Sequence, residues 1–168
     1  MKELQTRKRN KLESYDYSLP GSYFITICVK DRHEILGEVV GDDAHIVPFV
    51  ELTEIGETVK ARVDCISDTS NVRLETYVIM PNHIHLLLTI RDGTPRAASP
   101  TKGTVPQIVN ALKSLTTKQL GYSIWQRSYH DHIVRNTDEF NRISEYIDNN
   151  PMNWQDDCFH PLNWEKKC

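Results

Sequence analysis

Two histidines separated by one residue are the first feature of this sequence that could do chemistry. His83 and His85 lie in the stretch "YVIMPNHIHLLLTI", residues 77–90, which is typical of two apolar strands joined by a turn. Side chains two residues apart on a strand point to the same face, so the two imidazoles share one face while Ile84 and Leu86 point to the other. Such a pair either binds one metal ion or consists of structural histidines.

A tyrosine and an asparagine near the C-terminus form a second candidate pair. Tyr146 and Asn150 are four residues apart in a segment with helical apolar spacing, so a phenol and a carboxamide project from one flank of a helix. If that helix packs on the face that carries His83 and His85, the four side chains form one group. Two imidazoles and an amide hold a divalent ion with positions left open for water or phosphate oxygens. Taken alone, a tyrosine such as Tyr146 at a helix flank is more often a packing residue than a nucleophile.

A rival histidine pair lies in "YHDHIVR". His130 and His132 are also neighbours on one strand face, but no candidate nucleophile lies near them. We therefore expect His132 to support the main site indirectly, through a neighbouring side chain. The sequence has no G-x-S-x-G, G-x-x-x-x-G-K-[ST] or G-x-G-x-x-G motif, which excludes the common serine-hydrolase, phosphate-loop and dinucleotide signatures.

The elements that must position these residues follow from periodicity and capping signals. Strands are predicted over 23–32, 72–80, 83–90 and 125–135, and helices over 52–66, from the Thr104/Gln107 capping box onward, and from Asn136/Glu139 to Pro151. The order β-α-β-β-α-β is the ferredoxin-like split βαβ plan of the α+β class, an antiparallel sheet with two helices on one face. Its third strand, with the His83 and His85 pair, is central. The extra C-terminal helix, which carries Tyr146, is free to cover the opposite face.

Length and composition predict one globular domain over residues 1–168. The chain has 39% hydrophobic and 26% charged residues, and no apolar run is long enough to cross a bilayer or to serve as a signal-peptide core. We therefore expect a cytoplasmic, nucleoid-associated protein without membrane contact. Within the domain, we expect a basic N-terminal arm over 1–14, a mobile loop over 91–104 and a C-terminal tail over 152–168.

Charge is unevenly distributed along the chain. The net charge of −3 argues against a general nucleic-acid binder, because phosphate contacts come from Lys and Arg. However, the N-terminal arm is basic, whereas residues 38–57 contain acidic residues and no Lys or Arg. This separation predicts a polarised molecule with a basic side. The basic residues of the arm that we consider for DNA binding are Arg7, Lys8, Arg9 and Lys11.

The motifs as a set resemble a known family. The segments "YDYSLPGSYFITICVKDR", "YVIMPNHIHLLL", "IWQRSYHDHIVRN" and "YIDNNP" resemble the single-tyrosine HUH transposases, and most of all the branch of REP-associated tyrosine transposases. The resemblance covers residues 15–151, with the motifs in the family's order. It implies that His83 and His85 occupy the metal-binding pair, that Tyr146 occupies the nucleophile position, and that Asn150 occupies the third-ligand position.

The resemblance also implies an activity. It points to cutting and rejoining of single-stranded DNA, usually beside a small hairpin, through a 5′-phosphotyrosine intermediate with Mg²⁺ or Mn²⁺ as the cofactor. Lys113, at the family's Lys-Ser pair, and Arg127 join the arm as candidate DNA contacts. The resemblance is compatible with a homodimer and with a monomer. Two other functions stay open, a catalytically silent module that binds single-stranded nucleic acid and a metal-dependent hydrolase that attacks with water.

Overall fold

The computed structural model describes residues 19–41, 46–68, 71–91 and 103–163. The predicted basic arm, residues 92–102 of the predicted loop and the last five residues of the tail lie outside the described residues. Within the described ranges, no helix has the length and apolar character that crossing a bilayer requires.

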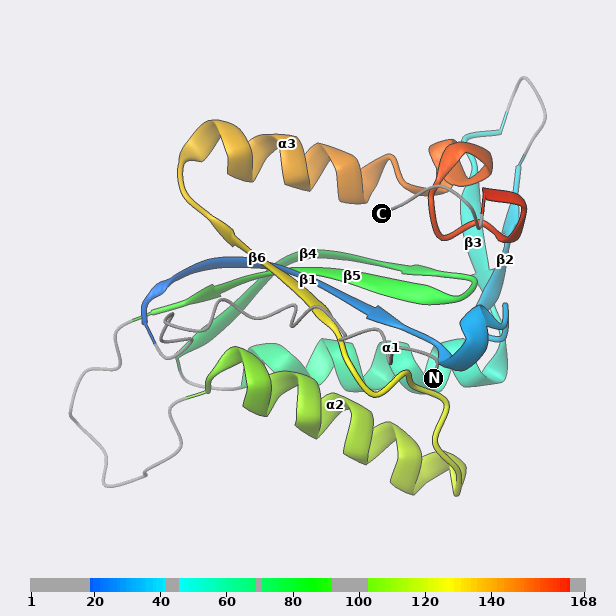
Figure 1. Ribbon diagram of the computed structural model, residues 1–168, viewed down its shortest axis with the longest axis horizontal. Helices are drawn as coiled ribbons and strands as arrows, with labels where there is room; N and C mark the ends of the chain where they lie inside the picture. The colour runs from blue at the N-terminus through cyan, green and yellow to red at the C-terminus, as the bar shows by residue number, and fades with distance from the viewer. Residues whose placement is uncertain (1–18, 42–45, 69–70, 92–102, 164–168) are drawn as a thin grey trace, which may run out of the picture.

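A four-stranded antiparallel sheet forms the centre of the molecule. Its strands, in the spatial order β4-β5-β1-β6, are β1 (Gly21–Cys28), β4 (Val72–Met80), β5 (His83–Ile90) and β6 (His130–Val134). Helices α1 (Glu54–Asp64) and α2 (Val105–Leu120) cover one face, and α3 (Thr137–Asp148) lies over the other (Figure 1). This arrangement confirms the predicted α+β, ferredoxin-like fold with an extra C-terminal helix. The strand with the two histidines, β5, pairs on both sides and is central, as predicted.

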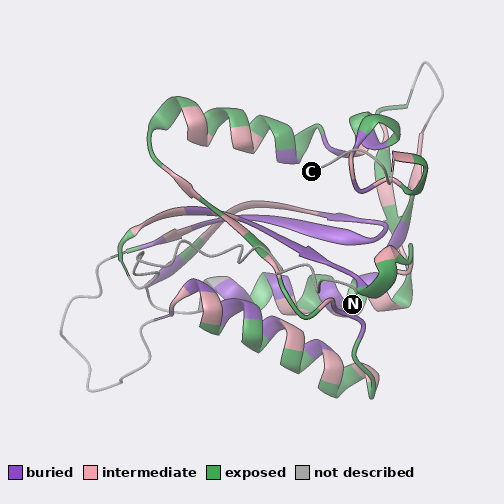
Figure 2. Ribbon diagram, in the orientation of Figure 1, coloured by how far each residue is buried: buried purple, intermediate pink, exposed green. Residues whose placement is uncertain are grey.

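The hydrophobic core lies between the sheet and the first two helices. Alternate residues of β1 and β5 pack in one core cluster with residues of α1 and α2. Figure 2 shows that most of β5 and much of β1 are buried. The central members of this core are Ile25, Ile27, Ile84, Leu86, Leu88, Val59, Val63 and Val109. Each such aliphatic side chain contributes about 1.5–3 kcal/mol when it is fully buried. The strand alternation therefore fixes which face of the sheet is left for polar residues.

The two predicted capping boxes differ in the structure. At α2, Thr104 accepts a hydrogen bond from the Gln107 backbone and the Gln107 side chain accepts one from the Thr104 backbone, which confirms a complete capping box. At α3, the Asn136 side chain accepts from the Glu139 backbone. The Glu139 carboxylate, however, accepts from the backbone of Arg135 instead of closing the box. Only the first half of the second predicted box is therefore present.

The predicted fourth strand is shorter than its sequence pattern suggests. The ladder covers only His130–Val134, and Trp125 forms an isolated bridge with Val29. Between them, the Lys113 ammonium donates to the carbonyl oxygens of Gln126 and Ser128, at 2.8 and 3.0 Å. These carbonyls bond to a side chain from α2 rather than to a neighbouring strand, which explains why the β pattern does not continue there.

Two parts of the fold have no counterpart in the predicted elements. A small hairpin of β2 (Gly37–Val40) and β3 (Phe49–Leu52) is inserted between β1 and α1. In addition, residues 151–156 and 161–163 of the predicted tail form 3-10 turns. Trp154 and Phe159 of this segment pack with Cys28 and Met80 at one end of the sheet. The described part of the tail is therefore a packed part of the domain.

Candidate metal and nucleophile site

The two histidines of β5 lie side by side beneath α3. His83 and His85 are 0% and 1% exposed, and their Nε2 atoms are 3.1 Å apart. The predicted shared face is therefore present, and it is the face opposite to the hydrophobic core. Two acceptor nitrogens at this distance repel each other unless a proton or a cation lies between them.

Hydrogen bonds at the far sides of the rings orient both imidazoles. The Asn82 amide nitrogen donates to the Phe159 carbonyl at 2.9 Å, which turns the Asn82 side-chain oxygen toward His83 Nδ1, 2.9 Å away. Because the Asn82 oxygen accepts, His83 Nδ1 carries the donated proton, and the lone pair of His83 Nε2 faces His85 Nε2. His85 Nδ1 lies 2.8 Å from the Thr26 hydroxyl, which can donate or accept and so suits either tautomer of His85.

Helix α3 and the turn that follows it bring Tyr146 and Asn150 to the same place. The Tyr146 hydroxyl lies 3.4 Å from His85 Nε2, while the side chain remains 42% exposed, so the hydroxyl is at the edge of the site. Asn150, one turn later, is 1% exposed. Its Oδ1 atom is buried and has no hydrogen-bond partner among the described residues, which leaves an amide acceptor available to a ligand.

Asp157 completes the group, and the sequence interpretation missed it. Its Oδ2 atom accepts from the Tyr146 hydroxyl at 3.3 Å and from Asn150 Nδ2 at 3.2 Å. One ligand atom from each of His83, His85 and Asp157 lies within 4.8 Å of the others, so one metal ion could contact all three residues. Asp157 falls in the predicted tail. The aromatic residues in "NWQDDCFH", residues 153–160, were the signal that this segment packs against the domain.

The corner after β1 holds the Asp157 segment in position. Arg32 has a left-handed backbone conformation (φ 55°), and its guanidinium donates to the Cys158 carbonyl at 3.1 Å. The same guanidinium lies 5.1 Å from the centre of the Phe159 ring, which itself lies 4.5 Å from the His83 ring. Asp157 Oδ1 accepts from the Phe159 backbone at 2.6 Å. Contacts between residues far apart in sequence therefore orient this carboxylate.

Burial determines the protonation states in the group. Removal from water lowers the pKa of His85 to about 3 and moves the pKa of His83 well below its ordinary value. Both imidazoles are therefore neutral near pH 7, the form that binds metal ions. Burial, with the charge of Asp157 as a second cause, raises the pKa of Tyr146 to about 12. The phenol therefore carries its proton, which points toward a carboxylate acceptor.

The donor set fits a divalent cation. It comprises two imidazole nitrogens, a carboxylate and an amide oxygen that lacks a described partner. Imidazole ligands suit Mn²⁺ and the later first-row ions, whereas Mg²⁺ prefers oxygen ligands throughout. The cluster is therefore compatible with binding of a divalent metal ion.

His132 lies one strand away from the group. Phe24 of β1 pairs with His132 in the sheet, and the Phe24 ring centre is 5.1 Å from that of His85. The His132 Nε2 atom is 2.7 Å from a Glu139 carboxylate oxygen, and its side chain is 49% exposed. His132 thus lies on the far side of Phe24 from His85, and its described hydrogen bond is to α3.

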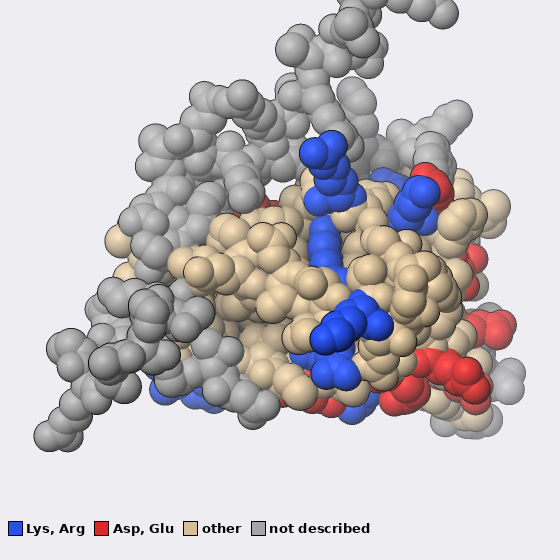
Figure 3. Space-filling model, turned by 90° about the horizontal axis from the view of Figure 1, so that it is seen from below, with Lys and Arg blue, Asp and Glu red and all other residues tan. Residues whose placement is uncertain are grey.

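Among the described residues, the predicted DNA contacts Lys113 and Arg127 lie apart from the histidines. Lys113 belongs to α2 on the opposite face of the sheet, and Arg127 is exposed in the segment before β6. Figure 3 shows Lys and Arg side chains along the middle of the face formed by α1 and α2, with acidic side chains toward one edge. The four basic residues of the arm lie outside the described residues.

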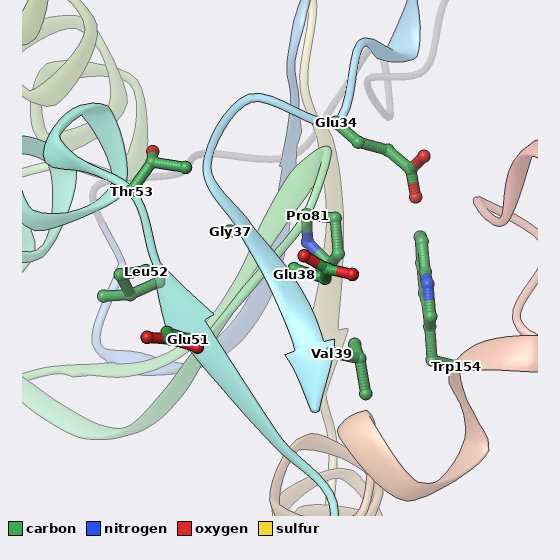
Figure 4. A pocket seen from close by; sticks show the side chains of 9 residues that line it. All are labelled: Glu34, Gly37, Glu38, Val39, Glu51, Leu52, Thr53, Pro81 and Trp154. Atoms are coloured by element: carbon green, nitrogen blue, oxygen red, sulfur yellow. The ribbon is translucent and has the colours of Figure 1, made fainter. Parts of the chain in front are cut away.

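A pocket of about 620 Å³ lies on the other side of Trp154 from this group. Its lining includes Glu34, Glu38 and Glu51, and in Figure 4 the side chains of Glu34 and Glu38 lie on the same side of the pocket as the Trp154 ring. The Trp154 ring is 5.9 Å from the His83 ring. Three carboxylates would repel a phosphate backbone, so this pocket is poorly suited to DNA.

Comparisons with known proteins bear on the family of this chain. Residues 18–150 match the family model described as "Transposase IS200 like". An uncharacterized protein of Haemophilus influenzae is 32% identical, over 90% of this chain and 91% of its own. The ISDra2 transposase TnpA of Deinococcus radiodurans is 28% identical, over 71% of this chain and 75% of its own.

A solved structure extends the comparison to the fold. The structure of a REP-associated tyrosine transposase bound to a REP hairpin superposes with a TM-score of 0.60 at 19% identity, and the match covers 86% of this chain and 74% of that chain. At this level of identity the likeness concerns the fold. The family match covers most of the sequence and includes both histidines, Tyr146 and Asn150. The chain therefore belongs to the IS200-like transposase family.

Proposed function

We propose that this protein cuts and rejoins single-stranded DNA with Tyr146 as the nucleophile. The observation that carries the proposal is the position of the Tyr146 hydroxyl, 3.4 Å from His85 Nε2 and 3.3 Å from Asp157 Oδ2. A hydroxyl at the partly exposed edge of a cluster of buried ligands can reach a backbone phosphate that approaches from solvent. Nucleophilic side chains that form covalent intermediates have this kind of arrangement.

The reaction is a transfer of one phosphodiester bond. The Tyr146 oxygen loses its proton and bonds to the phosphorus, and the bond between phosphorus and the 3′ oxygen breaks. That oxygen takes up a proton and leaves as a free 3′-OH, while the DNA 5′ end stays on Tyr146. The link conserves the energy of the phosphodiester, so a 3′-OH can reverse the step without ATP.

Asp157 supports the first proton movement. A phenol whose pKa is about 12 does not ionise spontaneously near neutral pH, so it needs an acceptor as it attacks. Asp157 Oδ2 accepts the hydrogen bond of this hydroxyl. Asn150 Nδ2 donates to the same oxygen and keeps the carboxylate turned toward Tyr146. Asp157 thus orients the hydroxyl for attack.

His83, His85, Asn150 and Asp157 would hold the divalent cation. When bound there, Mn²⁺ or Mg²⁺ offsets the negative charge of the phosphate and polarises its oxygens. The residues themselves supply neutral imidazoles, a buried amide oxygen and a carboxylate, in a site closed on one side by Trp154 and Phe159.

The proposed substrate is single-stranded DNA beside a hairpin. The motif resemblance supports it, as does the structural relative, which was solved bound to a REP hairpin. The net charge of −3 indicates that contacts are local rather than spread over a wholly basic surface. The basic arm, Lys113 and Arg127 remain candidate backbone contacts outside the catalytic group.

The test uses a pool of DNA hairpins with randomised single-stranded flanks, incubated with the protein and Mn²⁺ and run on a denaturing gel. In one half of the pool the label is at the 3′ end and in the other half at the 5′ end. We expect a protein-linked band with the 3′ label only, because the 5′ end created by cleavage stays on the protein. Tyr146→Phe removes the nucleophilic oxygen and should abolish this band.

Tyr122→Phe is the matched control, since Tyr122 is an exposed tyrosine far from the histidines and its loss should leave the band unchanged. Cleavage that persists in Tyr146→Phe would instead indicate a hydrolase that attacks with water. Binding of the pool without any cleavage by the wild type would indicate a silent binding module.

A further inference from the structure

A pocket that Tyr146 helps to line opens between α3 and the edge of the sheet formed by β1 and β6. It has a volume of about 420 Å³ and is lined by Phe24, His132, Glu139, Arg142, Ile143 and Tyr146. Protein pockets for small ligands span about 300–1,000 Å³, so this one is large enough for a single nucleotide. We call it the α3 pocket.

A second hollow continues along the same helix, toward its N-terminus. Its volume is about 270 Å³, and it is lined by Ser22, Val134, Arg135, Asn136, Thr137 and Phe140. Both hollows exist because α3 packs loosely, with only Ile147 fully buried among its residues. A single DNA strand that lies along α3 would therefore pass the second hollow and then the α3 pocket on its way to Tyr146.

The α3 pocket contains an aromatic ring next to the reacting groups. The Phe24 ring centre is 5.1 Å from that of His85, and it meets the Tyr146 ring edge to face at 6.1 Å. Phe24 is only half-buried, so part of its ring faces the pocket. An aromatic ring of this kind is a surface on which an unpaired base can stack.

The charges around the α3 pocket favour one orientation of a nucleotide. Arg142 is exposed, lines the pocket and has no ion pair or hydrogen bond described among residues 19–41, 46–68, 71–91 and 103–163. Glu139, also in the lining, already accepts from His132 and from the Arg135 backbone. A phosphate is attracted to Arg142 and repelled by Glu139, so the Arg142 end is the favourable end for the backbone.

We propose that the α3 pocket binds one unpaired nucleotide of the single-stranded substrate, next to the phosphate that Tyr146 attacks. Its base stacks on Phe24 and contacts Ile143, and its phosphate pairs with Arg142. The inference rests on the proposed function for its position in the reaction. It adds a subsite that holds the DNA beside the nucleophile, because a base fixed on Phe24 limits the movement of the adjoining phosphate.

The test measures binding of fluorescein-labelled oligothymidylate by fluorescence anisotropy in the Tyr146→Phe background, where no covalent link can form. Phe24→Leu keeps an apolar side chain but removes the ring, and we expect about 5- to 100-fold weaker binding. Phe24→Tyr restores the ring and should bind within about twofold of the parent. The rescue separates stacking from a general loss of packing.

Arg142→Gln supplies an independent measurement on an exposed residue whose loss does not threaten folding. If Arg142 contacts one phosphate, the slope of log affinity against log salt should decrease by about 0.7. Lys118→Gln removes the same charge from α2, across the sheet, and should leave affinity and slope unchanged.

Affinities of Phe24→Leu and Arg142→Gln equal to that of the parent would overturn the subsite. Failure of the parent to bind oligothymidylate would overturn it as well. Neither result bears on the proposed cleavage by Tyr146. That proposal is tested separately, by whether the wild type forms a protein-linked band with the hairpin pool.

Discussion

At the centre of β5 the two faces of the sheet are both buried and chemically opposite. Leu86 of β5 is 0% exposed and packs in the core between the sheet and helices α1 and α2. His85, the residue before it, is 1% exposed and faces α3. One strand thus supplies an aliphatic core on one side and a polar cluster on the other.

This difference shows that burial serves two purposes in one strand. On the core face it removes apolar surface from water and stabilises the fold. On the α3 face it keeps imidazoles neutral and leaves the Asn150 oxygen without a described partner, which contributes little stability. The α3 face is therefore built for binding a ligand, at some cost to the stability of the apo protein.

The largest expected effect is a loss of folding stability when the core face of β5 is changed. Leu86→Ala should lower the free energy of unfolding by about 2–5 kcal/mol, because it leaves a cavity in a fully packed region. His85→Gln, one residue away, keeps most of the volume and an amide that can bond to Thr26, so at pH 8, above the titration of histidine, it should lower the free energy of unfolding by only about 1 kcal/mol. Urea denaturation of both variants in EDTA measures the contrast. Equal losses would show that the α3 face is a structural core as well.

The second prediction concerns metal affinity at the α3 face. Asp157→Asn and His85→Gln should each weaken Mn²⁺ binding at least tenfold, roughly the effect of disturbing a metal-ligand environment. Isothermal titration calorimetry measures this affinity without DNA. Asp156→Asn is the matched control, since Asp156 is the exposed neighbour of Asp157. Unchanged affinity in Asp157→Asn would remove Asp157 from the ligand set.

A third prediction uses pH to compare the faces. Unfolded histidines take up protons near pH 6.5, whereas the pKa of folded His85 is about 3. Between these values the unfolded state binds more protons, so stability falls as pH decreases, by about 1.4 kcal/mol per pH unit for each such histidine. In EDTA, His85→Gln should reduce this slope by about that amount. An identical slope in both proteins would contradict the neutral, buried state of His85.

The smallest effect concerns Lys113 on the core side. Lys113→Met keeps the aliphatic stem but removes hydrogen bonds to two carbonyl groups, and it should cost about 1–2 kcal/mol in thermal or urea unfolding. Lys118→Met, at an exposed position on the same helix, should change stability by less than about 0.5 kcal/mol. A loss of DNA affinity in Lys113→Met without a loss of stability would instead support a direct DNA contact.

Local patterns predicted the hairpin of β4 and β5 well, whereas the strand predicted over 23–32 is β1, which ends at Cys28 before a 3-10 turn over Lys30–Arg32. The strands over 72–80 and 83–90 match β4 and β5 at both ends, because alternation and a turn signal are properties of neighbouring residues. Thr104 begins α2 for the same local reason. The hairpin of β2 and β3 escaped prediction, since strands of four residues are too short for a clear period.

Local patterns failed where a contact with a residue far away in the sequence determines the local structure. The pattern over 125–135 indicates a strand throughout, yet Lys113 withdraws two of its carbonyls from pairing. Asp157 looked like part of a tail, because nothing near it in sequence shows that Arg32 and Asn82 hold the following residues against the sheet. Such contacts join residues that no sequence window contains together.

The sequence by itself therefore determined which side chains are neighbours. These are the two histidines on β5, and Tyr146 with Asn150 at and just beyond the end of α3, because strand and helix periods set those neighbours. Only the tertiary structure decided that α3 covers the histidine face, that Asp157 joins the group, and that Lys113 lies across the sheet. Those outcomes depend on packing between elements far apart along the chain, which is where the free energy of burial and of buried hydrogen bonds acts.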